Sequence, residues 1–568
     1  MVSPASSMRR ARTTSACAAA VVVAVLATPG SAVAAQGGDP DSRERIGTAA
    51  GTTTDGAGAA AFAARTTDRI AGADRYATAV AASRAAFPSA NPAGLTTVYL
   101  ASGTGYADAL AAGPAAVASS GTLLLTQSNK LTAATASELR RLAPDRVVVV
   151  GGPGAVAGKV LDDVRAIGLP ASRVSGTDRY ATADAVARQA FPAGARTAWV
   201  TTGRGYADAL AAGPAAGAAG GPVVLVDGNA RGLSGATRRL LTDLGVTTVR
   251  IAGGTGAVSS GIQADLTGLV GSGSVTRSAG SDRYRTAIAV SHLAFPSLTK
   301  GDTYVATGTG FADALAVGVL AGRSKRPLYL STPYCATTTV RTELSRGVFG
   351  RLRLVGGPGA IRGLVGTLTP CQSISSASSP WVVVNKKRPL SPLRYAPSPL
   401  VGPSLPNING QLLRSDAAAA LADLAAGSRS AGAGRLAMLS GYRSYSYQSS
   451  VYSAKVASSG VAEADKWVAR PGHSEHQTGL GTDVSPIGAA NCSSYTCIGS
   501  TPQGRWIAAN AWRYGFVVRY ESGRTSTTGY SPEPWHLRYV GKPLAQDYHS
   551  GGWHTLEDYF DLPDAPRY

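Results

Sequence analysis

Three short sequence markers recur in the same order three times along this chain, and this repetition constrains the fold more than any other feature. The first marker starts at Arg69 (RIAGADRYATA), Arg173 (RVSGTDRYATA) and Arg277 (RSAGSDRYRTA). The second reads GYADALAAGPAA twice and GFADALAVG once, and the third reads VVGGPGAV, IAGGTGAV and LVGGPGAI. Self-similarity at a fixed period indicates tandem copies of one structural module.

Each copy alternates short apolar segments with Ala-rich segments of helical length. In the first copy, we expect strands at residues 96–102, 122–126 and 146–152, and helices at 107–119 and 132–143. This alternation predicts a parallel sheet with helices on both faces, because the strands are continuous apolar runs. We therefore expect three doubly wound α/β modules, at residues 69–172, 173–276 and 277–371.

The first 34 residues have the pattern of a secretory signal peptide. A basic region (Arg9, Arg10 and Arg12) precedes an apolar stretch at residues 16–27, and small residues at 32–34 suit cleavage. The apolar stretch is shorter than the roughly 20 residues that span a bilayer, and no later stretch is long and apolar enough. We expect an exported protein without a transmembrane span, with a flexible linker at residues 35–68.

The charge balance indicates a polyanionic partner. The 568 residues include 54 Lys and Arg against 34 Asp and Glu, a formal net charge of +20 at pH 7. Such a chain suits nucleic acid, an anionic lipid surface or an anionic cell-wall polymer. Export argues against nucleic acid. Because 44% of the residues are hydrophobic and only 15% are charged, the chain is not a disordered polyelectrolyte.

Export also makes disulfide bonds plausible for the four cysteines beyond the signal peptide. These four cysteines allow three pairings. Their neighbourhood in the sequence favours Cys335 with Cys371 and Cys492 with Cys497. A metal-binding role for Cys492 and Cys497 is the alternative, although no second cysteine pair accompanies them.

The three repeated markers resemble the cell wall binding repeat type 2 family of Gram-positive surface proteins. The resemblance covers about residues 69–371 and implies three α/β modules that assemble into an intramolecular pseudo-trimer. It also implies non-covalent attachment to an anionic polymer of the cell wall, which the positive charge balance suits. We expect the repeated Asp and Arg of the DRY strings to form ion pairs within or between modules rather than polymer contacts.

A Ser-rich linker at residues 372–380 ends the repeats, and histidines become frequent after it. PGHSEHQTGLGTDVSP begins at Pro471, and EPWHLRY begins at Glu533. His476, Asp483 and His536 together supply three ligands for a catalytic zinc with one open position. Glu533 would then act as the base that takes a proton from water on the metal. His473 competes with His476 as a ligand, and histidines that merely lie near acids on the surface are the alternative.

SEHQTGLGTD and EPWH together resemble the VanY-like D-alanyl-D-alanine carboxypeptidases, which are zinc enzymes that trim peptidoglycan stem peptides. SGYRSYSYQ, which ends at Gln448, also matches this family, and the resemblance covers about residues 381–568 as an α+β domain. It implies that zinc (Zn2+) is bound by His476, Asp483 and His536. It also implies that Glu533 is the general base. The residues that would contact the substrate are Arg443, Gln448 and Ser474. Arg443 would also stabilise the developing oxyanion.

These observations together predict a secreted zinc D,D-carboxypeptidase that is attached non-covalently to the Gram-positive cell wall and removes the terminal D-Ala of stem peptides. The closest alternatives use the same zinc site for L,D-carboxypeptidase or endopeptidase cleavage of peptidoglycan. An alternative of another class is a surface adhesin whose peptidase domain is inert. The shape of the substrate pocket decides among D,D-carboxypeptidase, L,D-carboxypeptidase and endopeptidase activity, and the sequence does not determine that shape.

Overall fold

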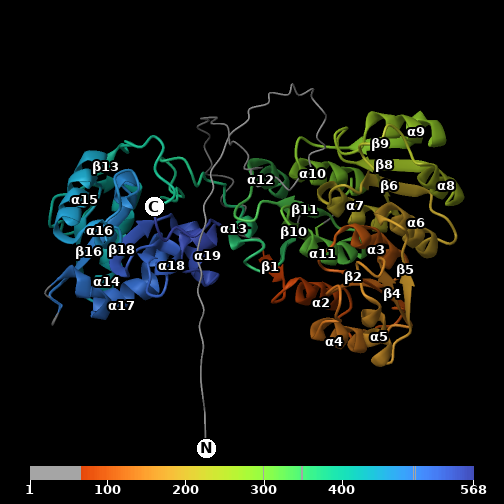
Figure 1. The fold of residues 1–568 in the computed structure, drawn as a ribbon, viewed down its shortest axis with the longest axis horizontal. Helices are drawn as coiled ribbons and strands as arrows, with labels where there is room; N and C mark the ends of the chain where they lie inside the picture. The colour runs from red at the N-terminus through yellow and green to blue at the C-terminus, as the bar shows by residue number, and fades with distance from the viewer. Residues whose placement is uncertain (1–65, 299, 347–349, 490–491, 493) are drawn as a thin grey trace, which may run out of the picture. The chain divides into compact units, whose positions relative to one another are not determined.

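The three repeats fold into three four-stranded sheets in which all strands run parallel. The computed structural model describes residues 66–568 apart from residues 299, 347–349, 490–491 and 493 (Figure 1). The strand orders are β3–β2–β4–β5, β7–β6–β8–β9 and β11–β10–β12–β1. The parallel α/β architecture predicted for the repeats is therefore confirmed. The strands of the first sheet are β2 (Thr97–Ser102), β3 (Thr122–Thr126), β4 (Arg146–Val150) and β5 (Ala171–Val174).

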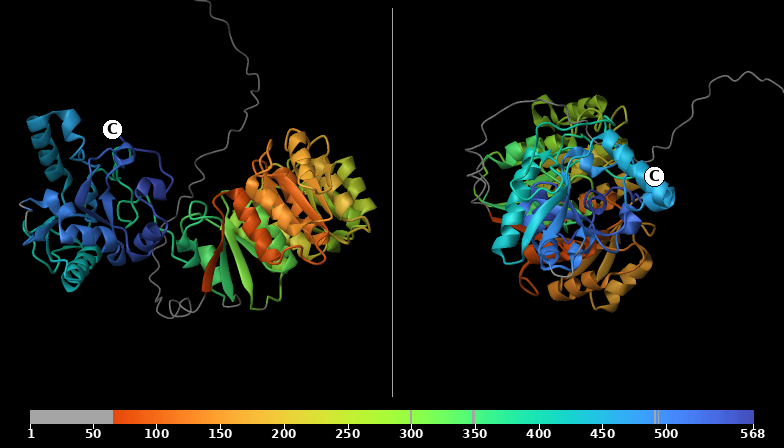
Figure 2. Two further views of the ribbon diagram at one scale, coloured as in Figure 1. Left: turned by 90° about the horizontal axis from the view of Figure 1, so that it is seen from below. Right: turned by 90° about the vertical axis from the view of Figure 1, so that its left-hand side faces the viewer.

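The first marker of each repeat begins with a strand that pairs with the sheet of another module. In the left view of Figure 2, β1 is the red strand beside the green strands of the third sheet, where it pairs with β12. The boundaries predicted after residues 172 and 276 fall inside β5 and β9, and β1 begins inside the predicted linker. The strands of the other two sheets are β6 (Thr197–Thr202), β7 (Val223–Val226), β8 (Thr248–Ala252), β9 (Val275–Ser278), β10 (Asp302–Thr307), β11 (Leu328–Ser331), β12 (Arg351–Val355) and β1 (Thr66–Ile70).

Both faces are buried along strands β2, β3, β7 and β11, whereas the edge strands β5 and β9 are mostly part exposed. In β2, Tyr99 and Ala101 face a core that all three modules share, whereas Val98 and Leu100 face a separate outer core. This alternation explains why strands such as β4 and β7 have apolar residues on both faces. Besides the three helices described next, the helices of the repeats are α2 (Arg75–Ala86), α4 (Ala133–Leu142), α5 (Gly158–Ala166), α6 (Arg179–Ala190), α8 (Gly235–Asp243), α9 (Ser260–Val270), η1 (Ser272–Ser274), α10 (Arg283–Ala294), α12 (Thr338–Leu344) and α13 (Gly363–Gly366).

The helices of the second marker contribute many residues to the shared core. Helices α3 (Ala107–Ala118), α7 (Ala207–Ala218) and α11 (Ala312–Arg323) pack against one another. Their small Ala and Gly residues allow this close approach. An aromatic residue precedes each helix, and the three rings meet with centroids 5.5, 5.9 and 5.7 Å apart. These rings belong to Tyr106, Tyr206 and Phe311, and their mutual contact is the pseudo-threefold arrangement that the resemblance implied.

The DRY strings have a different role from the expected one. The Asp of each string is the N-cap of the helix that follows, where its carboxylate accepts a backbone N–H. The Arg of each string donates to a backbone carbonyl and lies over an aromatic ring of a neighbouring module. The three contacts are Arg75 with Gly103 and Phe311, Arg179 with Gly203 and Tyr106, and Arg283 with Gly308 and Tyr206. In the described chain these arginines form no close ion pair, but each one acts electrostatically against the burial that raises the pKa of an Asp of a neighbouring module, namely Asp313, Asp108 and Asp208.

The C-terminal domain is built on a four-stranded antiparallel sheet of order β15–β16–β18–β17. Helices surround this sheet, which is the α+β architecture that the sequence predicts. The strands are β13 (Leu400–Val401), β14 (Leu413–Arg414), β15 (Arg435–Ser440), β16 (Gly481–Ile487), β17 (Phe516–Tyr520) and β18 (Glu533–Tyr539). The helices are α14 (Ser415–Ser430), α15 (Tyr445–Ser459), α16 (Val461–Ala464), η2 (Glu475–Thr478), η3 (Tyr495–Ser500), α17 (Pro502–Asn510), η4 (Ala511–Tyr514), α18 (Thr525–Thr528), α19 (Lys542–Ser550) and α20 (Leu556–Tyr559).

Arg362 of the third repeat is fully buried against the C-terminal domain. Its guanidinium carbon lies 4.0 Å from the centroid of the Trp553 ring, and its Nη2 donates to the carbonyl of Tyr559 at 2.6 Å. Tyr334 of the same repeat donates to Asp561 at 2.8 Å. The third repeat therefore has polar and aromatic contacts with the domain that follows it.

Two disulfide bonds join Cys335 to Cys371 and Cys492 to Cys497. This is the pairing that the sequence neighbourhood favours. The first bond lies in an apolar cluster that also holds Leu364 and residues of the C-terminal domain. The second bond joins Cys492 and Cys497, the two cysteines for which metal binding was the alternative role.

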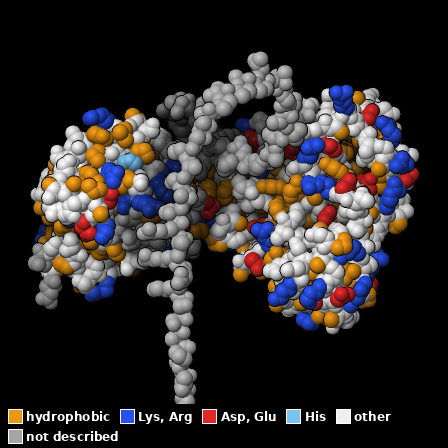
Figure 3. Space-filling view, in the orientation of Figure 1, with side chains coloured by type: hydrophobic (Ala, Val, Ile, Leu, Met, Phe, Trp, Pro, Cys, Tyr) orange, Lys and Arg blue, Asp and Glu red, His pale blue; other side chains and the backbone are white. Residues whose placement is uncertain are grey.

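The predicted signal peptide and all but the last three residues of the predicted linker lie outside the described residues. In the part of the chain that is described, no helix has the length and apolar character needed to cross a membrane. Figure 3 shows Lys and Arg side chains spread over the visible face of the repeats, with Asp and Glu among them.

Candidate active site

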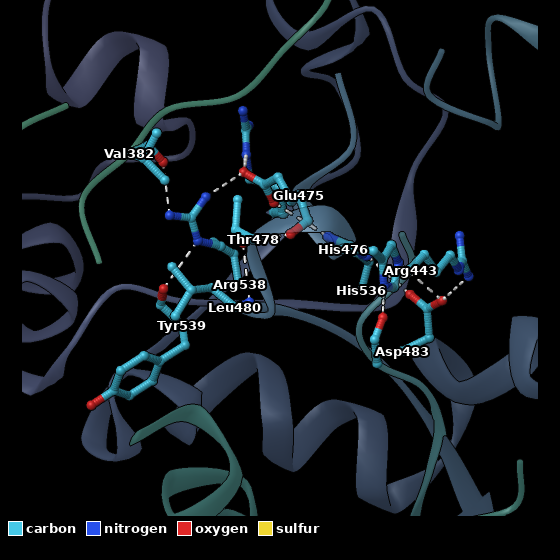
Figure 4. A network of polar contacts seen from close by, with 12 residues as sticks. Val382, Arg443, Glu475, His476, Thr478, Leu480, Asp483, His536, Arg538 and Tyr539 are labelled. Atoms are coloured by element: carbon cyan, nitrogen blue, oxygen red, sulfur yellow. Dashed lines mark hydrogen bonds and ion pairs between the residues drawn. The ribbon is translucent and has the colours of Figure 1, made fainter. Parts of the chain in front are cut away.

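The two motif strings of the C-terminal domain meet where β16 lies beside β18. Asp483 on β16 is the direct cross-strand partner of His536 on β18, and Oδ1 of Asp483 lies 2.9 Å from Nδ1 of His536. His476 comes from η2, just before β16, and its Nε2 lies 3.3 Å from Oδ2 of Asp483. Gly479 ends η2 with a positive φ of 69°, which turns the chain from η2 toward β16. Figure 4 shows the three side chains converging.

These three side chains fit a metal ion. One ligand atom of each lies within 4.8 Å of the others, and all three residues are buried. Nδ1 of His476 is within 2.8 Å of the carbonyl of Gly441, so Nε2 is the nitrogen turned toward Asp483. Two imidazoles and one carboxylate are a donor set that zinc accepts, and three protein ligands leave a fourth position open.

The protonation of the cluster follows from its burial and its charges. Burial alone would raise the pKa of Asp483, but His476 and His536 hold it well below its usual range. Burial lowers the pKa of His476, and the nearby Arg443 lowers it further. Burial also acts to lower the pKa of His536, but hydrogen bonds to Asp483 and Glu475 raise it to about 9. The carboxylate at the centre of the cluster is therefore ionised, as a metal ligand must be, whereas His536 carries a proton at neutral pH that a bound metal ion would displace.

Glu533 is the first residue of β18 and is buried beside the cluster. Burial raises the pKa of its carboxyl to about 8, and the negative charge of Asp483 acts in the same direction. The pairing of β17 with β18 shifts register between Val518 and Tyr520, so the regular alternation of strand side chains does not extend to Glu533. In the described part of the chain no hydrogen bond reaches its carboxyl group, which leaves both oxygens available for proton transfer.

Of the three residues expected to contact substrate, Arg443 touches the cluster. Arg443 donates from Nη2 to Oδ2 of Asp483 and from Nε to Oγ of Ser440, each at 3.0 Å. Gln448 is buried on α15, where its Nε2 donates to the carbonyl of Ala469 at 2.8 Å and its buried Oε1 has no partner among the described residues. Ser474 is buried immediately before η2.

His473 lies apart from the cluster. Its Nδ1 is 2.8 Å from the carbonyl of Asn385, and its ring packs edge-on against Tyr568 at 5.1 Å between centroids. Of the two histidines that competed as ligands, the structure thus brings His476 to Asp483 and His536.

Sequence reasoning missed a buried charge network behind His536. Glu475 accepts hydrogen bonds from Arg519 at 2.9 Å and from Arg538 at 3.0 Å, and Arg519 also pairs with Glu557 at 2.8 Å. All four side chains are almost completely buried. Four residues from four separate segments give no spacing pattern, and the only available signal was the position of Glu475 next to His476.

Comparison with known proteins matches both parts of the chain to families. Residues 410–542 match VanY, the D-alanyl-D-alanine carboxypeptidase family. The matches to cell wall binding domain 2 cover residues 69–161, 173–263 and 277–365.

Relatives in Bacillus subtilis cover different parts of the chain. YodJ, to which a carboxypeptidase activity is ascribed, is 38% identical over 195 residues, which are 34% of this chain and 70% of YodJ. The N-acetylmuramoyl-L-alanine amidase LytC is 30% identical over 302 residues, which are 53% of this chain and 57% of LytC.

Solved structures that are similar to the C-terminal domain include LdcB and a VanY variant. The LD-carboxypeptidase LdcB is 37% identical with a TM-score of 0.30, and the match covers 33% of this chain and 88% of LdcB. A variant of the vancomycin-resistance D,D-pentapeptidase VanY in complex with Zn(II) is 32% identical with a TM-score of 0.27, and the match covers 32% of this chain and 97% of that one. The chain therefore belongs to the VanY family of D-alanyl-D-alanine carboxypeptidases and has three cell wall binding domains ahead of its VanY domain.

Proposed function

We propose that this protein is a secreted zinc D,D-carboxypeptidase that is held on the cell wall by its repeats and removes the terminal D-Ala from peptidoglycan stem peptides. The observation that carries the proposal is the buried cluster of His476, Asp483 and His536 with Glu533 beside it, in a domain of the carboxypeptidase family. Family membership and the wall-binding repeats together support a carboxypeptidase that acts on peptidoglycan, without specifying which bond it cleaves.

The residues of the cluster have separable tasks in this reaction. His476, Asp483 and His536 would hold zinc, whose chemistry in such a site is Lewis acidity that polarises a carbonyl and lowers the pKa of water to about 7. Glu533 accepts a proton from the attacking water and delivers it to the leaving amine of D-Ala. A pKa of about 8 leaves this carboxyl able both to take and to release a proton near neutral pH.

Substrate contacts are proposed for three further side chains. Arg443 uses Nε and Nη2 within the protein, which leaves Nη1 to donate to the oxyanion or to the terminal carboxylate of the peptide. The unpartnered Oε1 of Gln448 and the hydroxyl of Ser474 would bind the polar groups of the terminal D-Ala. A buried acceptor without a partner is costly in the free protein, so a bound N–H group would relieve it.

The repeats would keep the enzyme at its insoluble substrate. With a net charge of +20, the chain suits an anionic wall polymer, and such binding weakens as salt screens the charges. Attachment raises the effective concentration of the peptidase domain near stem peptides. The proposed domain limits are 69–172, 173–276 and 277–371 for the repeats as sequence units, and 381–568 for the peptidase.

The test uses the full chain with three substrates: a pentapeptide ending in D-Ala-D-Ala, a tetrapeptide ending in one D-Ala, and a cross-linked dimer. Free D-Ala is measured for metal-stripped protein, for protein with added zinc, and for the Glu533→Gln variant with zinc. We expect zinc-dependent release from the pentapeptide and none from the variant.

Other outcomes would replace the proposal with a specific alternative. Release of D-Ala from the tetrapeptide but not the pentapeptide would identify an L,D-carboxypeptidase. Cleavage of the dimer without free D-Ala would identify an endopeptidase. No cleavage and no zinc in the purified protein would leave the inert adhesin.

A further inference from the structure

His536 has two carboxylates, one at each ring nitrogen. Nδ1 lies 2.9 Å from Oδ1 of Asp483, and Nε2 lies 3.3 Å from Oε2 of Glu475. The ring of Tyr520 stacks on the imidazole with centroids 5.2 Å apart and planes inclined by 29°. The imidazole is therefore held on one face and at both nitrogens, as Figure 4 shows for Glu475 and Asp483.

The two nitrogens face different surroundings. Nδ1 points to the side of the ring where His476 and Asp483 converge, so it is the nitrogen available to a metal ion in the cluster. Nε2 points to Glu475, whose carboxylate can only accept. A hydrogen on Nε2 leaves the lone pair on Nδ1, because a neutral imidazole has one donor nitrogen and one acceptor nitrogen.

Glu475 is itself fixed in place. Its second oxygen, Oε1, accepts from Nε of Arg519 at 2.9 Å and from Nη1 of Arg538 at 3.0 Å. Arg538 in turn donates to the carbonyl of Val382 at 2.7 Å. The carboxylate and both guanidinium groups are buried, so rotation of Glu475 away from His536 would take from Arg538 its acid partner among the described residues and leave Arg519 with Glu557 alone.

We propose that Glu475 is a positioning residue that fixes the orientation and the tautomer of His536, so that Nδ1 is presented to the metal. This inference rests on the zinc site of the proposed function. Outer carboxylates that accept from a metal-bound imidazole orient the ring and raise its basicity, and their loss weakens metal binding. His476 has a backbone carbonyl, that of Gly441, in the corresponding place.

The chain offers a matched control for a test of Glu475. Glu557 is equally buried, and its Oε1 accepts from Arg519 and from Asn385, each at 2.8 Å. It belongs to the same charge network but has no contact with His536 among the described residues. Replacing either acid with Gln removes one buried negative charge beside the same arginine, so an effect shared by both variants reports on the network rather than on His536.

The experiment measures zinc affinity of the full chain by competition with a chromophoric chelator, for the parent protein, Glu475→Gln and Glu557→Gln. We expect zinc to bind about 10- to 100-fold more weakly to Glu475→Gln, whereas Glu557→Gln should bind as the parent does. The visible absorption of the Co2+-loaded protein should change in the first variant alone, because it reports the geometry of the ligand field. Thermal unfolding of the metal-free proteins checks that both variants fold.

A third variant covers the case in which Glu475→Gln does not fold. Glu475→Asp keeps the charge for Arg519 and Arg538 but withdraws the carboxylate from His536, and we expect it to lose zinc affinity as well. Equal zinc affinity in the parent and a folded Glu475 variant, or an equal loss in Glu557→Gln, would overturn the inference alone. A parent protein that binds no zinc would overturn the proposed function and this inference together.

Discussion

Asp483 and His536 are cross-strand partners in the ladder between β16 and β18, although 53 residues separate them in the sequence. The register of this ladder brings the carboxylate to within 2.9 Å of the imidazole. A slip by one residue would turn one of the two side chains to the opposite face of the sheet. The central pair of the cluster therefore depends on strand pairing, and η2 adds His476 to it.

Replacing Asp483 with Asn should abolish stoichiometric zinc binding. The amide keeps the shape of the side chain but removes the charge that lies between the two histidines. Zinc content after dialysis, measured by atomic emission, should fall well below one ion per chain, and D-Ala release should fall with it. Asp465→Asn is the control, because Asp465 pairs with Arg470 outside the cluster. Full zinc content in Asp483→Asn would contradict its assignment as a ligand.

Replacing Glu533 with Gln should separate catalysis from metal binding. We expect kcat to fall by about 10²- to 10⁴-fold, the usual contribution of a general base, while zinc content stays at the parent level. Glu521→Gln is a suitable control, since Glu521 pairs with His554. If Glu533→Gln lost zinc as well, Glu533 would have to be counted among the ligands instead of the base.

Asp184 should make the second repeat less stable at neutral pH than at mildly acidic pH. It occupies the position of Val80 in the first repeat and Ile288 in the third. Its Oδ1 is buried without a partner in the described chain, and burial raises its pKa from the ordinary value of 3.8 to about 6. Between these two values the folded state binds more protons than the unfolded state, so the free energy of unfolding falls as pH rises from about 4 to 6.

Asp184→Val should remove this penalty and raise the melting temperature of the repeats at pH 7.5. One pKa unit corresponds to about 1.4 kcal/mol, and because the side chain is partly exposed, we expect a gain of about 1 kcal/mol. Calorimetry at pH 4.5 and pH 7.5 measures it, and the difference between variant and parent should shrink at the lower pH. An equal gain at both values would show that packing, and not ionisation, is the cause.

The sequence was sufficient for the features that depend on pattern. Repetition and continuous apolar strands predicted the parallel α/β modules, and the two motif strings predicted which residues would meet around His536. The sequence was not sufficient to predict strand pairing where one strand can pair with either of two equivalent sheets. The strand that begins at Thr66 has the same pattern as β5 and β9, and only closure of the three modules on one another shows that it completes the third sheet.

The buried charge network around Glu475 was the other feature that could not be predicted from the sequence. Arg519, Arg538 and Glu557 look like ordinary surface residues in the sequence, because charged side chains are rarely fully buried unless they are paired. Their pairing with Glu475 depends on long-range contacts that no local pattern encodes. The direct contacts of the DRY arginines were hard to predict for a related reason, since a guanidinium can be satisfied by carbonyls and aromatic rings as well as by acids.

Replacing Arg362 with Ser should weaken the contacts of the C-terminal domain with the repeats. Arg362 occupies the position that Ala157 has in the first repeat and Ser259 in the second. Ser259 caps α9 by accepting the N–H of Ile262, so Arg362→Ser should preserve or improve the start of α13. The same change removes the hydrogen bond to Tyr559 and the contact with the Trp553 ring. It therefore weakens the contacts between the third repeat and the C-terminal domain, and within the repeat it also removes a hydrogen bond to the carbonyl of Pro358 and the contact with the Tyr334 ring.

Hydrogen bonds from charged groups contribute about 1.5–3 kcal/mol, so the loss should be measurable. We expect protease cleavage in the segment 372–380 to be faster in Arg362→Ser than in the parent, and calorimetry to show the peptidase domain unfolding at a lower temperature. Arg323→Ser is the control, since Arg323 lies over Phe87 within the repeats. Cleavage at the parent rate would mean that the apolar cluster around the Cys335–Cys371 bond holds the two parts together without help from Arg362.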